Sequence, residues 1–188
     1  MMVKVLISCM DYRLTEEIQK EADSNTLIFR NAGANVKEFI ERLKEIKPDE
    51  IIYMPHTDCA AMKLVFNVTK KGDKVSNEVE EKLVSQFADK KFDSLEELER
   101  LNASLNEEIL KQITPNVKTR LIDVNQLKWP NKITKVYFYQ PNQRAKEIGA
   151  YILQSTSIKD VHADILIATE NLGFKEVYDC STGECKAL

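Results

Sequence analysis

Short apolar runs and helical stretches alternate along the first third of the chain. Residues 3–7, 26–29 and 50–54 are largely apolar runs, with the length and composition typical of buried parallel strands. Between them, residues 14–22 and 36–46 carry apolar side chains at the spacing of an amphipathic helix. This alternation of strand and helix predicts an α/β fold with a central, mainly parallel β-sheet flanked by helices.

The middle of the chain is polar and helical. Helical spacing continues over residues 61–69 and 79–87, and Ser94-Leu-Glu-Glu97 has the form of a capping box that opens another helix. This helix carries an apolar stripe, which predicts packing against the core or against another subunit. The stripe consists of Leu95, Leu98, Leu101, Leu105 and Ile109.

The last third alternates again between apolar and polar segments. The pattern predicts strands at residues 118–124 and 134–139, a helix at 143–154, and a hairpin made of 164–169 and 174–178. No internal repeat, low-complexity segment or linker interrupts the chain. We therefore expect a single domain over residues 1–188.

Composition limits the kinds of binding partner and the cellular compartment that we expect for this protein. The 188 residues include 27 Lys and Arg against 30 Asp and Glu, and the net charge of −3 gives no general attraction to nucleic acid or to an anionic membrane. The N-terminal apolar run is too short for a signal peptide, and no run reaches the roughly 18 apolar residues of a membrane span. We expect a cytoplasmic protein whose four cysteines stay reduced and can bind metal.

Two cysteines and a histidine come directly after two of the predicted strands. Cys9 follows the run at residues 3–7, and His56 and Cys59, three positions apart, follow the run at 50–54. Open parallel sheets gather functional residues beyond the carboxyl ends of their strands. Two Cys and one His form a ligand set of catalytic zinc sites, which keep a fourth position open for water. Each residue alone would be an ordinary buried side chain, but the set of three predicts a Zn²⁺ site.

Three segments together resemble the β-class carbonic anhydrases, especially the short archaeal and bacterial forms. They are Ile7-Ser-Cys9-Met-Asp11-Tyr-Arg13, Phe29-Arg-Asn-Ala-Gly-Ala34 and His56-Thr-Asp-Cys59, and the resemblance covers residues 3–68. It implies that Cys9, His56 and Cys59 are the zinc ligands and that Asp11 and Arg13 form a catalytic pair beside the metal. The arginine would keep the aspartate ionised. In some family members this aspartate moves onto zinc, so Asp11 is either a helper or a reversible inhibitor.

The chain departs from the family at several positions. Pro55 and Ala60 stand where the family usually has glycines, and the methyl group of Ala60 would crowd a small linear substrate. Family members usually begin with helices, whereas the first strand here starts at residue 3. Residues 70–140 form a divergent segment, longer and more helical than the resemblance implies. The family's fourth strand fits two registers, at Val161-His162 or at Val177-Tyr-Asp179, and both stay open.

Several other side chains have both a functional and a structural interpretation. Gly33 would allow close approach of backbone or substrate, and Arg30 would anchor its loop through carbonyl contacts. Asp58 either supports the ligands or is an exposed acid, and His162 is either a proton shuttle or structural. Cys180 and Cys185 could pair on a second metal or in a disulfide, but with no histidine near them we expect free thiols.

The resemblance implies a zinc enzyme that interconverts CO2 and bicarbonate, a small-molecule substrate, as a homodimer or larger homo-oligomer. One alternative is a zinc hydrolase of carbonyl sulfide or carbon disulfide. Another is a catalytically silent zinc-binding homologue with a structural or regulatory role. A phosphatase loop is excluded, because it needs five residues between Cys and Arg and only three separate Cys9 from Arg13.

Overall fold

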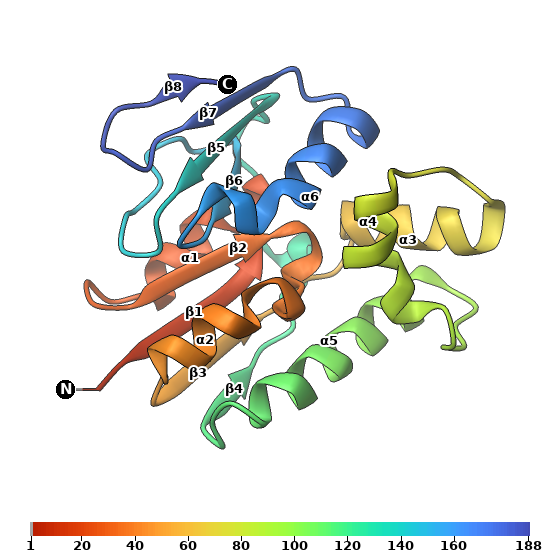
Figure 1. Ribbon diagram of the computed structural model, residues 1–188, viewed down its shortest axis with the longest axis horizontal. Helices are drawn as coiled ribbons and strands as arrows, with labels where there is room; N and C mark the ends of the chain where they lie inside the picture. Colours follow the sequence, from red (N-terminus) through yellow and green to blue (C-terminus); the bar gives the residue numbers. More distant parts are fainter. Residues whose placement is uncertain (1) are drawn as a thin grey trace.

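A mixed β-sheet of eight strands organises residues 2–188, the part of the chain that this computed structural model describes (Figure 1). Its strand order is β4-β3-β1-β2-β6-β5-β7-β8. The strands are β1 (Lys4–Cys9), β2 (Leu27–Asn31), β3 (Glu50–Met54), β4 (Val117–Thr119), β5 (Lys135–Tyr139), β6 (Tyr151–Gln154), β7 (Glu176–Asp179) and β8 (Lys186–Ala187).

Helices connect these strands. The α-helices are α1 (Thr15–Glu21), α2 (Ile40–Ile46), α3 (Ala60–Lys71), α4 (Asn77–Lys82), α5 (Leu95–Lys111) and α6 (His162–Leu166). Short 3₁₀ turns are η1 (Tyr12–Leu14), η2 (Ala32–Ala34), η3 (Val36–Phe39), η4 (Val84–Phe87), η5 (Val124–Gln126) and η6 (Ile158–Val161), and η7 (Ile167–Asn171) is a π-helical turn. In Figure 1, α1 lies behind the sheet and α2 in front of it, while α3, α4 and α5 gather at one side.

The parallel centre of the sheet comes from the three apolar runs of the first third. β1 pairs in parallel with both β2 and β3, and Ser8 lies opposite Arg30 on one side and Met54 on the other. The carboxyl ends of the three strands therefore meet at one edge of the sheet. An α/β fold with a mainly parallel sheet flanked by helices is confirmed.

The second half of the sheet joins the first through an antiparallel strand. β6 pairs antiparallel with β2, and β5 then pairs in parallel with β6 and β7. The backbone N–H of Ile152 donates to the carbonyl of Met10 at 3.0 Å. The beginning of β6 thus lies at the carboxyl edge of β1, next to the loop that follows Cys9.

The helix predicted at residues 143–154 is wrong. Residues 143–150 are irregular and residues 151–154 form strand β6. Gly149 has a positive φ of 103°, which ends any helical path. The buried apolar run that follows packs between β2 and β5, and so short a run reads equally well as strand or helix.

The hairpin predicted from residues 164–169 and 174–178 is also wrong. Residues 162–171 are helical, and β7 pairs in parallel with β5 instead. A capping box precedes this helix: Ser157 Oγ accepts from Lys159 N–H, and Asp160 Oδ2 accepts from Ser157 N–H. Val161-His162 therefore belongs to a helical turn, whereas Val177-Tyr-Asp179 lies in β7.

The middle segment follows its predicted pattern with changes in detail. Ser94 caps α5 by accepting from Glu97 N–H at 3.2 Å, but the Glu97 carboxylate accepts from Asp93 N–H, so the capping box is not reciprocal. The leucine stripe of α5 packs against the chain's own core. The strand predicted at 118–124 is shorter, because only Val117–Thr119 pairs with β3.

No helix within residues 2–188 combines the length and the apolar character needed to cross a bilayer.

Candidate metal centre

Cys9, His56 and Cys59 converge at the carboxyl edge of the parallel strands. Cys9 is the last residue of β1, His56 follows β3 by two positions, and Cys59 is the N-cap of α3. Their ligand atoms all lie within 4.8 Å of one another. The three side chains are at most 4% exposed, so these donor atoms face one another in a space closed to bulk water.

The imidazole of His56 leaves one nitrogen free. Its Nδ1 lies 2.7 Å from the Thr57 carbonyl, a contact in which Nδ1–H donates. The Nε2 atom is buried and has no hydrogen-bond partner. A buried polar atom without a partner is costly, and two sulfur atoms lie beside it. This donor set fits a metal ion, and Zn²⁺ takes such Cys and His ligands.

The pKa values of the two thiols shift in opposite directions. Burial raises the pKa of Cys9, but the hydrogen bond from Cys59 and the charge of His56 outweigh it and bring that pKa well below its ordinary value. The hydrogen bond to Cys9 and then burial raise the pKa of Cys59 well above its ordinary value. Burial lowers the pKa of His56, but the negative charge of Cys9 more than offsets this. Cys9 is therefore the more acidic of the two thiols, and thiolate is the form of cysteine that binds metal.

Arg13 holds Asp11 in a bidentate ion pair beside this group. Arg13 Nε donates to Asp11 Oδ1 at 3.1 Å, and Nη2 donates to Oδ2 at 2.7 Å. The backbone N–H of Arg13 adds a third hydrogen bond to Oδ1 at 2.8 Å. Burial raises the pKa of Asp11, but these hydrogen bonds and the charge of His56 bring it below its ordinary value. Asp11 is therefore a fixed carboxylate at neutral pH.

Asp58 is tied to the same arginine. Its Oδ2 accepts from Arg13 Nη1 at 2.9 Å, and its Oδ1 pairs with Lys63 at 2.5 Å. Its φ of 54° is left-handed, which turns the chain sharply between His56 and Cys59. Asp58 thus supports the ligand loop through Arg13, although its side chain is 42% exposed.

Arg30 is a buried anchor for the loop after β1. Its guanidinium donates to the carbonyls of Cys9 and Asp11 and to the hydroxyl of Thr15, all at 2.8–2.9 Å. Burial lowers the pKa of Arg30 to about 10, so the side chain stays charged at neutral pH. The expected anchoring through carbonyl contacts is confirmed.

Gly33 lies beside the candidate ligand Cys9, whereas Ala60 lines a pocket that none of the three candidate ligands lines. The N–H of Gly33 donates to Cys9 Sγ at 3.4 Å. Its φ is 79°, and an added Cβ would lie 3.0 Å from the end of Met62. Ala60 opens α3 next to Cys59, but the pocket of about 360 Å³ that it lines contains none of the three candidate ligands.

Sequence reasoning missed two buried residues of α5 that hold these loops. Glu99 Oε2 accepts from the backbone N–H of Cys59 at 2.7 Å, and Asn102 Nδ2 donates to the Gly33 carbonyl at 2.9 Å. Asn106, one turn further on, donates to Asn102 and accepts from Val36 N–H. The signal was a polar stripe at helical spacing next to the leucine stripe.

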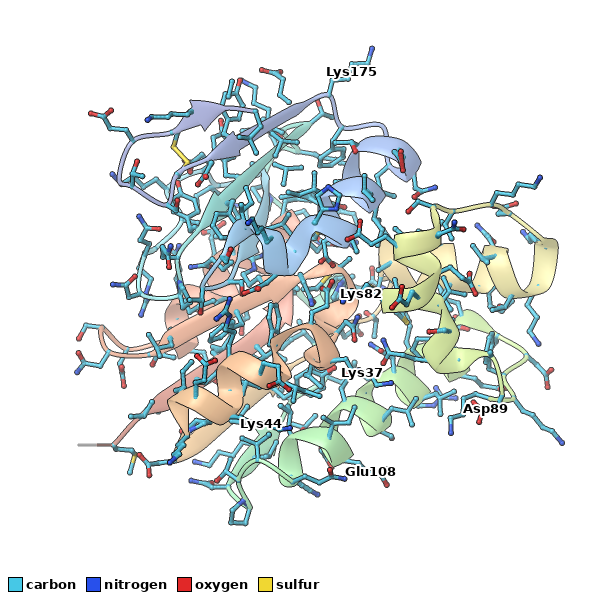
Figure 2. All side chains as sticks on the ribbon, viewed as in Figure 1. Lys37, Lys44, Lys82, Asp89, Glu108 and Lys175 are labelled. Atoms are coloured by element: carbon cyan, nitrogen blue, oxygen red, sulfur yellow. A yellow bond between two sulfur atoms is a disulfide. The ribbon has the colours of Figure 1, made fainter. Side chains whose placement is uncertain are left out.

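Two other candidate positions lie away from the centre. His162 is at the start of α6, where its Nδ1 lies 2.6 Å from the carboxylate of Glu78, and its side chain is 57% exposed. Cys180 and Cys185 form a disulfide across the β7–β8 turn, seen as the yellow bond in Figure 2. The expectation of free thiols there is wrong, because the turn brings the two Cα atoms within 4.0 Å.

No protein-family model and no curated protein matches the sequence. Among solved structures, the chain is similar to a carbonic anhydrase from Glaciozyma antarctica. The identity is 20% and the TM-score 0.41, over 66% of this chain and 79% of that one. A likeness of this size assigns neither family nor function, which must be argued from the site itself.

Proposed function

We propose that the chain binds Zn²⁺ through Cys9, His56 and Cys59 and catalyses the reversible hydration of CO2 to bicarbonate. The observation that carries the proposal is the unpaired, buried Nε2 of His56 in a group of three residues whose ligand atoms lie within 4.8 Å of one another, next to a carboxylate held by an arginine. The motif resemblance of residues 3–68 to β-class carbonic anhydrases supports it independently.

Cys9, His56 and Cys59 would hold Zn²⁺, which would supply Lewis acidity and lower the pKa of water toward neutrality. Asp11 is fixed as a carboxylate by Arg13, and its oxygens accept a proton or a hydrogen bond from the reacting water. Arg13 keeps Asp11 ionised and oriented. Gly33 lets the backbone lie close to Met62, because an added Cβ would lie 3.0 Å from the end of that side chain.

Two thiolates donate more negative charge to zinc than imidazoles do, so activity should favour alkaline pH. The test is stopped-flow CO2 hydration at alkaline pH on protein with about one zinc per chain. Activity that is lost in Cys59→Ser supports the proposal. A zinc-loaded wild type with no hydration activity would refute it. Release of sulfide from carbonyl sulfide or carbon disulfide by that same sample would identify the hydrolase alternative, and inactivity on all three substrates would leave the silent homologue.

A further inference from the structure

The segment between β4 and β5 crosses the loop that carries His56. We call residues 120–134 the strap. The carbonyl of Ile122 accepts from Thr57 N–H at 2.9 Å, and the N–H of Ile122 donates to the Pro55 carbonyl at 2.8 Å. The N–H of Val124 donates to Thr57 Oγ1 at 3.2 Å. The first part of the strap is therefore fixed to the loop before and after His56.

The far end of the strap is fixed to the loop before β6. Ile133 N–H donates to the Gly149 carbonyl at 2.8 Å. A Cβ at Gly149 would lie 2.2 Å from the Asn131 carbonyl, so the strap can take this path only against a glycine. Between the two fixed ends, most of residues 125–132 is exposed.

The exposed part of the strap places the aromatic ring of Trp129 close to the Arg13 guanidinium. Trp129 is the only tryptophan of the chain. Its Nε1 donates to the Val124 carbonyl at 2.7 Å, and its ring centre lies 4.7 Å from Cζ of Arg13. The ring is thereby oriented by the fixed part of the strap. Its side that does not cover Arg13 remains open, since Trp129 is 46% exposed.

Arg13 is held by two carboxylates and lies close to the ring of Trp129. Its three nitrogens donate in the guanidinium plane to Asp11 and Asp58. A planar guanidinium stacks on an aromatic face, and this contact limits rotation out of the plane. Asp58 is 42% exposed and is shared with Lys63, so it restrains Arg13 less firmly. Arg13 Nη2 also donates to the Asp58 carbonyl at 2.9 Å, and the Tyr12 ring centre lies 6.0 Å from Arg13 Cζ, so Trp129 supplies the nearer of two aromatic contacts.

We propose that Trp129 is a positioning residue for the reaction. It fixes the plane of the Arg13 guanidinium and so keeps the Asp11 carboxylate oriented beside the three candidate ligands. The inference rests on the proposed function, because it assigns Trp129 a role in that same site.

The first test measures the contact between Trp129 and Arg13 and does not depend on enzyme activity. Acrylamide quenching of Trp129 fluorescence should rise in Arg13→Gln, because the covered face of the ring becomes accessible. Lys128→Ala, an exposed neighbour on the strap, serves as the control and should quench like the wild type. If circular dichroism shows that Arg13→Gln is unfolded, Arg13→Lys decides instead, since it keeps the charge and lacks the planar face. Unchanged quenching in the folded Arg13 variant would overturn the inference.

The second test separates positioning from simple stability. Trp129→Leu should lower kcat on the order of three- to five-fold, with KM nearly unchanged, because a cation–π contact at a half-exposed site is lost. Trp129→Phe should restore kcat, because it keeps an aromatic face, and both variants should melt close to the wild type. Equal kcat in Trp129→Leu and the wild type would overturn the inference. An inactive wild type would instead refute the proposed function, while the quenching experiment still decides the contact.

Discussion

The carboxylate of Glu99 accepts a hydrogen bond from the backbone N–H of Cys59 at 2.7 Å, across 40 positions of sequence. Glu99 lies on α5, within the segment that the resemblance marks as divergent. Together with Asn102, which holds the Gly33 carbonyl, it ties α5 to both loops around the candidate ligands. The divergent segment therefore supports the candidate metal centre directly.

Removing the Glu99 carboxylate should weaken this support. Glu99→Ala leaves the buried N–H of Cys59 unpaired, so we expect a loss of about 1–3 kcal/mol in the free energy of unfolding and weaker zinc binding. Glu99→Gln keeps an acceptor oxygen and should lie much closer to the wild type. Urea unfolding and zinc competition with a chromophoric chelator measure both effects. Equal behaviour of the Ala and Gln variants would show that this hydrogen bond does not matter.

Zinc should stabilise the folded chain through His56. A ligand that binds only the native state at 1,000 times its Kd adds about 4 kcal/mol to stability. Thermal melting should therefore rise with zinc and fall again with a chelator in the wild type, but stay constant in His56→Asn. The same zinc-dependent shift in both proteins would place the metal elsewhere.

The buried carboxyl groups of Glu38 and Asp164 predict a pH dependence of stability. Asp164 Oδ1 accepts from Ala32 N–H at 2.8 Å. Burial raises the pKa of Asp164 to about 6, and burial together with the charge of Asp164 raises the pKa of Glu38. Both groups bind protons more tightly in the native state than in the unfolded chain. The contribution of Asp164 to stability is therefore greatest in acid and declines as the pH rises through about 4 to 6, and Glu38 acts in the same direction.

Asp164→Asn removes this penalty while keeping an acceptor for Ala32. Relative to the wild type, its free energy of unfolding should increase by roughly 2–3 kcal/mol between pH 4 and pH 7. Asp89→Asn, an exposed position labelled in Figure 2, should show no such trend. Urea titrations across this pH range give the comparison, and parallel curves for Asp164→Asn and the wild type would contradict the prediction.

The disulfide should stabilise the β7–β8 turn modestly. Its cysteines are five positions apart, and closing so short a loop in the unfolded chain is worth about 2 kcal/mol. Reductant should lower the urea midpoint of the wild type but not that of a Cys180→Ala, Cys185→Ala double variant. Without reductant, the denatured protein should titrate only the thiols of Cys9 and Cys59. Four titratable thiols under those conditions would rule the disulfide out.

The sequence alone was sufficient to predict an element where the residues of that element carry the whole hydrophobic pattern. The strand at residues 50–54 was predicted with its observed bounds, because a largely apolar run buried on both faces needs no partner to be recognised. The candidate ligands Cys9, His56 and Cys59 could be placed together, since they lie at the carboxyl ends of neighbouring parallel strands.

The rest depends on contacts between distant segments. The short apolar run at residues 151–154 is compatible with a helix or a strand, and only its pairing with β2 and β5 makes it a strand. Glu99 reaches the backbone of Cys59 only because α5 packs beside that loop, and Trp129 reaches Arg13 only because the strap folds back toward it. No periodicity in the sequence encodes which loop a helix will face.

Co²⁺ titration of the metal-free protein would identify the ligands, because the absorption of bound cobalt depends on them. We expect thiolate-to-cobalt charge-transfer bands and tetrahedral d–d bands that saturate at one equivalent, with the charge-transfer intensity reduced in Cys59→Ser and in Cys9→Ser. The absence of these bands in the wild type, or their persistence unchanged in both variants, would contradict a metal centre formed by Cys9, His56 and Cys59.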